Sequence, residues 1–215
     1  MKNVLNVTTA LTVLTALFAS GCASTKLEQT WKAPTAPASP VKKVAVIGVD
    51  ERGLMRIGFE NRFVRDMKAR GQTATATHEL MTLPDIKADK EAAAVKLRAA
   101  GADAVLIVRL ADSETFNRSV RAGSERYVGT TTGVGSYYGW YDYYTVAFTD
   151  MSTVWSSDKK TLYLDSSLYD LASEKRIWSA LTETVIKDGT TDPLVEADRL
   201  TKMVVEAMAK DQLIR

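Results

Sequence analysis

Val41 to Val49 read VKKVAVIGV, an apolar run that is interrupted near its start by two lysines and followed by Asp50. A short run of this kind, rich in valine and isoleucine, is typical of a strand that is buried on both faces of a sheet. A second such run, AVLIV, occupies Ala104 to Val108. Two buried strands with helical sequence between them predict an α/β fold in which part of the sheet is parallel.

The residues between these two runs predict two helices and one more strand. Arg52 to Arg70 shows helical spacing, with Gly71 placed to stop the helix. Its apolar face consists of Phe59, Phe63, Val64 and Met67, and its i,i+4 ion pairs are Arg56/Glu60 and Arg62/Asp66. Gln72 to Met81 alternates threonine with alanine and predicts a strand, and Asp89 to Ala100 predicts an alanine-rich helix that ends at Gly101.

The second half of the chain is typical of antiparallel strands followed by one helix. Three extended segments are rich in Thr, Val, Tyr, Trp and Leu: Thr145 to Trp155, Thr161 to Tyr169 and Arg176 to Ile186. Asp170 to Lys175 suits a hairpin between the last two, and Leu162, Leu164 and Leu168 share one face. Asp192 can cap a final helix with Pro193 in its first turn and an apolar stripe of Leu200, Met203, Val204, Ala207 and Met208. We therefore predict one α/β domain over residues 41–215, with a mixed sheet built as β-α-β-α-β, then antiparallel strands and a C-terminal helix.

The beginning of the chain resembles a bacterial lipoprotein signal. Lys2 precedes an uncharged apolar stretch from Val4 to Ala19, and Ala19-Ser-Gly-Cys22 follows, with Ala19 where such signals most often have leucine. The resemblance implies a signal peptide over residues 1–21, cleavage between Gly21 and Cys22, and diacylglycerol and palmitate-type acylation of Cys22. The alternatives are a membrane-spanning anchor, for which the apolar stretch is short, and a buried cysteine.

The residues after Cys22 predict a location in the cell envelope and a tether. Ala23 and Ser24 stand where an aspartate retains many enteric lipoproteins in the inner membrane, which favours the outer membrane, facing the periplasm, without excluding the inner one. Ala23 to Pro40 contains three of the five prolines and no apolar periodicity. We expect residues 22–40 to form a lipidated tether. The 18 residues from Ala23 to Pro40 would reach about 56 Å as an extended spacer, at about 3.1 Å per residue, and about 23 Å as a flexible coil.

Composition excludes several classes of function. The 215 residues carry 28 basic and 26 acidic side chains, a balance that argues against a dedicated nucleic-acid binder. One cysteine and one histidine cannot supply a structural zinc or iron-sulfur site, so we expect no metal and no cofactor. Cleavage would remove Lys2 alone among the charged residues, so attachment should rest on lipid rather than on electrostatic attraction.

Three stretches carry a family resemblance that covers most of the chain after the signal. They are FENRFVRDMKARG (59–71), GADAVLIV (101–108) and LYDLASEKRIWS (168–179), and they resemble bacterial lipoproteins of uncharacterised function. The order of elements is similar to the small α/β domain shared by the TolB amino-terminal domain, CsgG and LpoB. The resemblance implies the fold and an envelope location, and it brings no catalytic residues.

Residues 123–144 form the most unusual stretch, with five of the twelve glycines and a cluster of rings. The rings are Tyr137, Tyr138, Trp140, Tyr141, Tyr143 and Tyr144. Glycine freedom combined with amphipathic rings suits a contact surface for a protein, a glycan or a membrane interface. The alternative is a surface loop with some rings packed on the sheet.

Other polar candidates are weaker. The glycines Gly53 and Gly58 have the spacing of a phosphate loop but are not followed by its Lys-Ser/Thr pair. His78 has no nucleophile beside it in the sequence, so we expect His78 to be a surface residue. Asp50 and Glu51 follow the first buried strand, where α/β sheets often bind ligands, and they are the best acidic pair for a hydrolase.

These patterns rank three functions. The first is a non-catalytic binding or scaffolding lipoprotein of the cell envelope, whose partners are the membrane, through Cys22, and an envelope protein or glycan. The second is a subunit of a self-assembling, CsgG-like secretion complex. The third is an envelope hydrolase.

Overall fold

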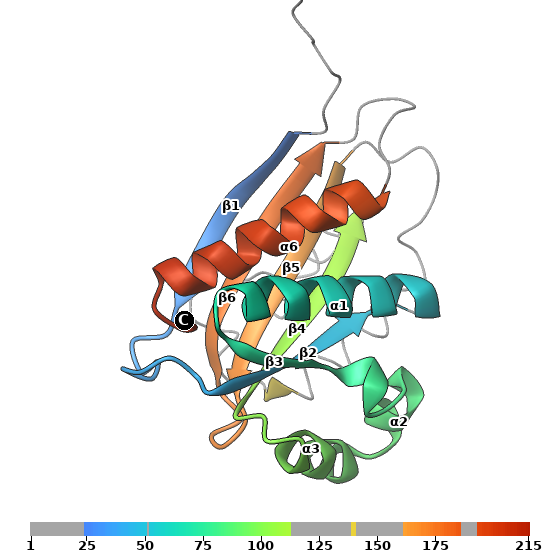
Figure 1. The fold of residues 1–215 in the computed structure, drawn as a ribbon, viewed down its shortest axis with the longest axis vertical. Coiled ribbons are helices and arrows are strands. Elements are labelled where there is room, and N and C mark those ends of the chain that lie inside the picture. Colours follow the sequence, from blue (N-terminus) through green and yellow to red (C-terminus); the bar gives the residue numbers. More distant parts are fainter. Residues whose placement is uncertain (1–23, 51, 113–138, 141–160, 186–192) are drawn as a thin grey trace, which may run out of the picture.

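The fold is organised around one mixed sheet of six described strands in the order β1-β6-β5-β4-β2-β3 (Figure 1). The structure is a computed structural model that describes residues 24–50, 52–112, 139–140, 161–185 and 193–215. The strands are β1 (Ser24–Lys32), β2 (Lys43–Val49), β3 (Thr73–Ala76), β4 (Ala104–Asp112), β5 (Thr161–Asp170) and β6 (Arg176–Val185). The helices are α1 (Gly53–Ala69), α2 (Leu83–Ala88), α3 (Lys90–Ala99) and α6 (Pro193–Lys210), with a 3-10 turn η1 (Thr77–Glu79).

The parallel part of the sheet lies around β2. This strand pairs in parallel with β3 on one side and with β4 on the other, where Val46 lies opposite Leu106. Helices connect these strands because parallel neighbours need a crossover. The predicted order of strand, helix, strand, helix, strand is confirmed. Gly71 and Gly101 adopt φ values of +80° and +78° directly after α1 and α3, as helix-stopping glycines do.

The antiparallel part consists of β4, β5, β6 and β1. β5 pairs with β4 and with β6, and the predicted hairpin joins β5 to β6. The predicted leucine face is confirmed, because Leu162, Leu164 and Leu168 all belong to one buried cluster. The strand predicted over Thr145–Trp155 lies outside the described residues.

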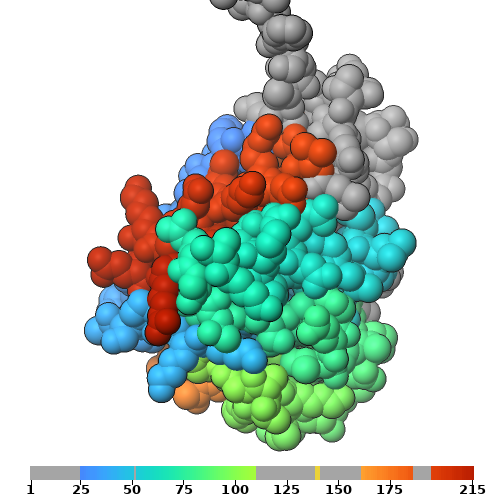
Figure 2. All heavy atoms as spheres, in the orientation of Figure 1, coloured from blue at the N-terminus to red at the C-terminus, as the bar shows by residue number. Residues whose placement is uncertain are grey.

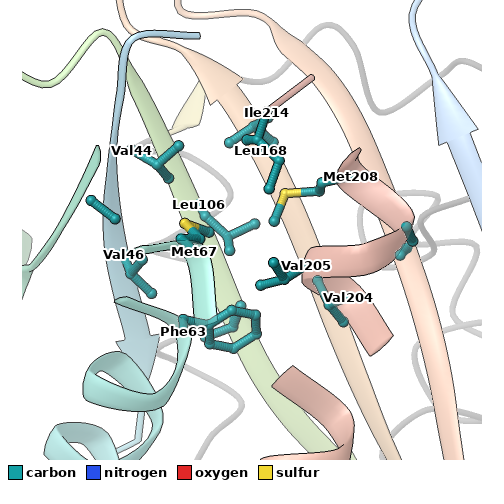
Figure 3. Close-up of a cluster of buried hydrophobic side chains, with 14 of the residues drawn as sticks. Val44, Val46, Phe63, Met67, Leu106, Leu168, Val204, Val205, Met208 and Ile214 are labelled. Atoms are coloured by element: carbon teal, nitrogen blue, oxygen red, sulfur yellow. The ribbon is translucent and has the colours of Figure 1, made fainter. Parts of the chain in front are cut away.

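Two helical layers cover the two faces of the sheet. α1 and α6 pack side by side on one face, and Figure 3 shows Phe63 and Met67 of α1 lying beside Val204, Val205 and Met208 of α6. Beneath them lie the sheet residues Val44, Val46, Leu106 and Leu168. The space-filling view shows these two helices in close contact (Figure 2). The opposite face carries a second apolar cluster, to which α2 and α3 contribute Ile86 and Leu97.

The segment after β2 and α1 differs from prediction in two ways. The strand predicted over Gln72–Met81 is limited to Thr73–Ala76, and the chain then turns through η1. The short helix α2 was not predicted, although its start has a capping box: the Thr82 side chain accepts from the Asp85 N–H, and the Asp85 side chain accepts from the Thr82 N–H. Six residues are too few to show a helical period in the sequence, so the capping box was the only sequence signal for α2.

The tether prediction is wrong over about half of its length. Ser24–Lys32 is strand β1 at the edge of the sheet, antiparallel to β6, with an irregularity between Leu27 and Gln29. An edge strand buries little, so its sequence lacks the apolar alternation that marks strands, and pairing with β6 decides its conformation. The three prolines lie in the connection from β1 to β2.

Candidate functional site

The predicted anchor and most of the aromatic loop lie outside the described residues. This holds for Gly21 and Cys22 and for the rings of Tyr137, Tyr138, Tyr141, Tyr143 and Tyr144. Trp140 is described, and the expectation that it offers a contact surface is wrong. Its side chain is 0% exposed and belongs to the apolar cluster of the α2/α3 face, together with Ile107 and Tyr169. This ring packs on the sheet, as the alternative interpretation of the loop allowed.

A cavity of about 520 Å³ lies where β1 ends, beside the hairpin between β5 and β6. Its volume is in the range of small-ligand sites. Its described lining comes from the end of β1 and the chain after it, from the hairpin with the first residue of β6, and from Gly139: Trp31, Ala33, Pro34, Thr35, Gly139, Ser173, Glu174, Lys175 and Arg176. We call this cavity the hairpin pocket.

Arg176 is the residue of the hairpin pocket that calls for an explanation. It is 2% exposed, and its guanidinium carbon lies 5.0 Å from the centre of the Trp31 ring. Within the part of the chain that the structure describes, its Nε and Nη2 have no hydrogen-bond partner. Stacking on tryptophan satisfies the face of the cation and leaves the N–H groups at its edge unpaired. A buried donor without an acceptor costs about 1–3 kcal/mol.

The charges of the described residues around Arg176 do not neutralise it. Among the described lining residues, the one acidic side chain is Glu174, which accepts from Lys90 Nζ at 2.7 Å and is thereby occupied. Lys175, the next residue, is exposed and adds a second positive charge at the rim. Glu174 itself has φ +59°, and a Cβ on Gly139 would lie 3.4 Å from its carboxylate, so the hairpin and residue 139 approach closely. The described residues of the hairpin pocket therefore carry an excess of positive charge.

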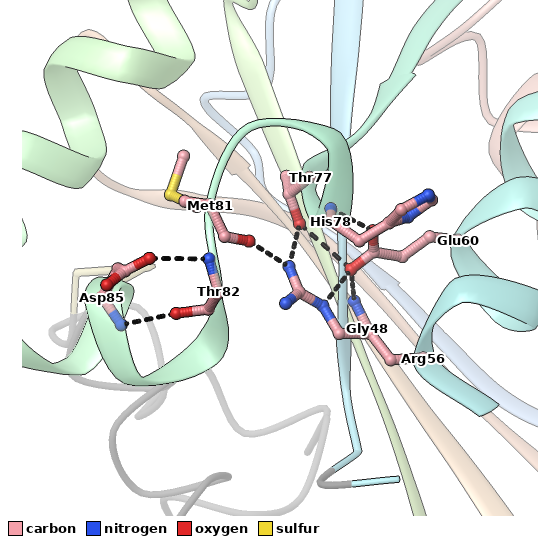
Figure 4. Close-up of polar contacts among 8 residues, drawn as sticks. All are labelled: Gly48, Arg56, Glu60, Thr77, His78, Met81, Thr82 and Asp85. Atoms are coloured by element: carbon pink, nitrogen blue, oxygen red, sulfur yellow. Dashed lines mark hydrogen bonds and ion pairs between the residues drawn. The ribbon is translucent and has the colours of Figure 1, made fainter. Parts of the chain in front are cut away.

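A buried carboxylate, Glu60 of α1, contacts Gly48 near the end of β2 (Figure 4). It is 0% exposed. Its Oε1 accepts from the Gly48 N–H at 2.9 Å, from Arg56 Nε at 2.8 Å and from Thr77 Oγ1 at 3.0 Å. Its Oε2 accepts from the His78 N–H at 2.6 Å and contacts His78 Nδ1 at 2.8 Å. Every acceptor position is used, so Glu60 joins β2, α1 and η1 and has a structural role.

His78 differs from its prediction as a surface residue. Its side chain is 17% exposed and contacts the Glu60 carboxylate. The predicted ion pair between Arg56 and Glu60 is confirmed, and Arg56 also donates to Thr77 Oγ1 and to the Met81 carbonyl. A cavity near Arg56 and Gly48 measures only about 10 Å³, roughly the volume of one water-sized probe. It offers no room for a ligand.

Asp50 is held by its neighbour in the chain. Arg52 donates to it through Nε at 2.9 Å and through Nη2 at 2.5 Å, and its backbone N–H donates at 2.9 Å. Glu51 lies outside the described residues. A carboxylate in a two-pronged ion pair is poorly placed to act as a general base, which weakens the predicted acidic pair as a hydrolytic centre.

The end of the sheet where β1 begins carries a small polar cluster. Lys26 Nζ lies 2.6 Å from Glu28 and 3.4 Å from Glu183, and Tyr163 donates to Glu183 at 3.0 Å. The hydrogen bond with Glu28 and the charge of Glu183 hold the pKa of Lys26 above its usual value. Burial raises the pKa of Tyr163 above its usual value, and the hydrogen bond to Glu183 raises it further. Two carboxylates against one ammonium leave this cluster without excess positive charge.

The described residues offer neither a membrane-spanning helix nor a metal site. No helix in the described ranges is long and apolar enough to cross a membrane. Among the same residues, no three His, Cys, Asp or Glu side chains gather in a way that could hold a metal ion. Neither Trp31 nor Arg176 was predicted as a site residue, because they meet only through the pairing of β1 with β6.

No protein-family model and no curated protein matches this chain. Among solved structures, it is similar to the PelC dodecamer from Paraburkholderia phytofirmans, with 12% identity, a TM-score of 0.44, and coverage of 89% of this chain and 99% of PelC. It is also similar to a lipoprotein from Neisseria meningitidis, with 13% identity, a TM-score of 0.41, and coverage of 78% of this chain and 96% of that one. Structural similarity at these TM-scores and identities does not support an inference about function. The resemblance to TolB, CsgG and LpoB stays a prediction.

Proposed function

We propose that this protein is a lipid-anchored envelope protein that binds a partner without catalysing a reaction, and that the hairpin pocket is its binding site. The observation that carries the proposal is the buried Arg176 guanidinium beside a cavity of about 520 Å³, with Nε and Nη2 that have no hydrogen-bond partner among the described residues. The described acidic candidates support binding over catalysis, because Glu60 and Asp50 are occupied by internal donors.

The chemistry of the hairpin pocket indicates a carboxylate on the partner. Nε and Nη2 lie on one edge of the planar guanidinium and match the two oxygens of a carboxylate. Trp31, Ala33 and Pro34 supply apolar wall beside this edge. Because Nε and Nη2 are enclosed, an acceptor on the partner reaches them only after a neighbouring side chain has moved aside. The proposed partner is an envelope component that presents an acidic group.

Replacing Arg176 by methionine tests this site. Met keeps an apolar stem over Trp31 and removes the unpaired N–H groups, so we expect the free energy of unfolding to stay unchanged or to rise by about 1 kcal/mol. Binding should be lost at the same time. A photo-crosslinking residue at the exposed Lys175 should capture an envelope component in cells, and the Arg176→Met change should reduce that adduct at least about tenfold.

Two comparisons make this result decisive. A crosslinker at Lys96, an exposed residue of α3, should capture no such component. Arg62→Met removes an arginine that pairs with Asp198 at 2.7 Å, and it should cost up to about 1 kcal/mol while leaving the adduct unchanged. An adduct that survives Arg176→Met, or a large loss of stability in that variant, would show that Arg176 is a structural residue.

The anchor has a separate test. The lipoprotein signal predicts that the mature protein begins at Cys22 and carries acyl chains, because two or three chains hold a protein stably in a bilayer. Mass spectrometry of the membrane-extracted protein should find a lipidated Cys22 peptide. Cys22→Ser should leave the signal uncleaved and the peptide free of lipid. An unmodified Cys22 in the mature protein would contradict the anchor and leave the hairpin pocket unaffected.

A further inference from the structure

The chain between the proposed anchor and the folded domain is very short. Ala23 alone separates Cys22 from Ser24, the first residue of β1. Two residue steps span at most about 7 Å even when fully extended. A lipid on Cys22 therefore leaves almost no slack before the sheet begins.

β1 is held to the sheet from its first residue. Ser24 pairs with Val185, and Thr25 pairs with Thr184. The Thr25 hydroxyl lies 3.0 Å from the Thr184 hydroxyl and donates to the Glu196 carboxylate of α6 at 3.2 Å. These contacts tie the start of β1 both to β6 and to the first turn of α6, so the sheet and the helix cannot swing away from the anchor independently.

Among the described residues, the same end of the molecule exposes apolar side chains. Val195, in the first turn of α6, is 58% exposed, and Leu27 of β1 is 39% exposed. Lys26 lies within ion-pair distance of both Glu28 and Glu183, so its charge is not free for anionic headgroups. Contact with a bilayer here would rest on the acyl chains and on exposed apolar side chains.

We propose that the anchored protein stands on its membrane in one orientation, with the end of the sheet that holds the start of β1 against the bilayer. This inference rests on the lipidation of Cys22 in the proposed function. β1 spans nine residues, about 27 Å at about 3.4 Å per step. The hairpin pocket begins at its far end, and Figure 1 shows the β5–β6 hairpin opposite the start of β1. The hairpin pocket therefore faces away from the bilayer, toward a partner in the aqueous compartment.

Fluorescence quenching in membranes tests the orientation. Lipidation consumes the only cysteine, so a single introduced cysteine is the only thiol to label. The lipidated protein is placed in phosphatidylethanolamine/phosphatidylglycerol vesicles that contain a headgroup-level doxyl lipid. A bimane label at Val195→Cys should be quenched several-fold more strongly than one at Ala172→Cys, an exposed position in the hairpin.

A spacer provides the matched control. Ten Gly/Ser residues inserted after Ala23 keep Cys22 and its lipid but release the domain, so the difference between the two labels should fall toward zero. Equal quenching at both positions without the spacer would overturn the proposal, as would a difference that the spacer does not change. Failure of lipidation has another signature, because the protein would then not float with the vesicles at all.

Discussion

Replacing Glu60 by glutamine is expected to lower the free energy of unfolding by at least about 3 kcal/mol, because removing one member of a buried ion pair leaves the other charge uncompensated. Glu60 is 0% exposed and pairs with Arg56, whose side chain is also buried. The amide keeps the shape of the side chain but turns a –NH₂ group toward donors such as the His78 N–H. Urea unfolding of the unlipidated chain from residue 23 onward measures the loss.

Glu79→Gln is the matched control for this change. Glu79 is exposed in η1 and follows His78, which contacts Glu60. The same carboxylate-to-amide change at Glu79 should alter the free energy of unfolding by no more than about 0.5 kcal/mol. If Glu60→Gln behaved like its control, the Glu60 cluster would not be the structural joint between β2, α1 and η1 that its contacts indicate, and it would return as a candidate functional group.

Replacing Trp178 by alanine is expected to cost about 3–5 kcal/mol, the usual range for a large aromatic side chain in a core. Trp178 is 0% exposed and lies in the cluster between the sheet and α6. Its Nε1 donates to Asp211 Oδ2 at 2.8 Å, just beyond the end of α6. The substitution therefore opens a cavity and removes one attachment of the C-terminal segment. Thermal or urea unfolding measures the sum.

A double-mutant cycle separates these two contributions. Trp178→Phe keeps most of the apolar area and loses the hydrogen bond, and Asp211→Ala loses the same bond from the other side. Asp211→Ala should cost about 1 kcal/mol in the natural chain and almost nothing in the Trp178→Phe background. Equal costs in both backgrounds would mean that the bond contributes nothing, and a cost below about 1 kcal/mol for Trp178→Ala would contradict the position of this ring in the core.

The contrast between Glu60, Trp178 and Arg176 bears on function. All three are buried, and the first two have satisfied polar atoms, so their loss should cost stability. The Arg176 edge is unpaired and should cost nothing to remove. Natural proteins keep such groups where binding requires them, at the expense of stability. A lower free energy of unfolding after replacement of Glu60 or Trp178, but not after replacement of Arg176, would distinguish a binding residue from structural ones.

Orientation connects the anchor to the hairpin pocket. The tether expected from the prolines would have let the domain stand off and rotate, whereas strand β1 brings the sheet to within two residues of Cys22. The prolines instead lie between β1 and β2, next to the hairpin pocket, which Pro34 lines. The same residues that were predicted to hold the domain away from the membrane thus form part of the site proposed to bind a partner.

The sequence alone determined the parts of this protein in which local pattern and burial agree. The buried strands β2 and β4, the helix α1 with its stop at Gly71, the β5–β6 hairpin and the stripe of α6 were all predicted, because each buries enough apolar surface to show its period in the residues. The lipoprotein signal stays a prediction of the sequence, based on the resemblance of a short motif.

The tertiary structure alone decided the parts whose partners are distant in the chain. Strand β1 has no apolar alternation and exists because β6 supplies its hydrogen bonds. Trp31 and Arg176 meet only because of that pairing, and His78 is turned toward Glu60 by the turn that follows β3. Trp140 was expected to meet a partner and is buried in the α2/α3 face instead. The physical reason is the same in each case: an edge strand, a buried ion and a stacked cation depend on contacts between residues far apart in sequence, and no local period records them.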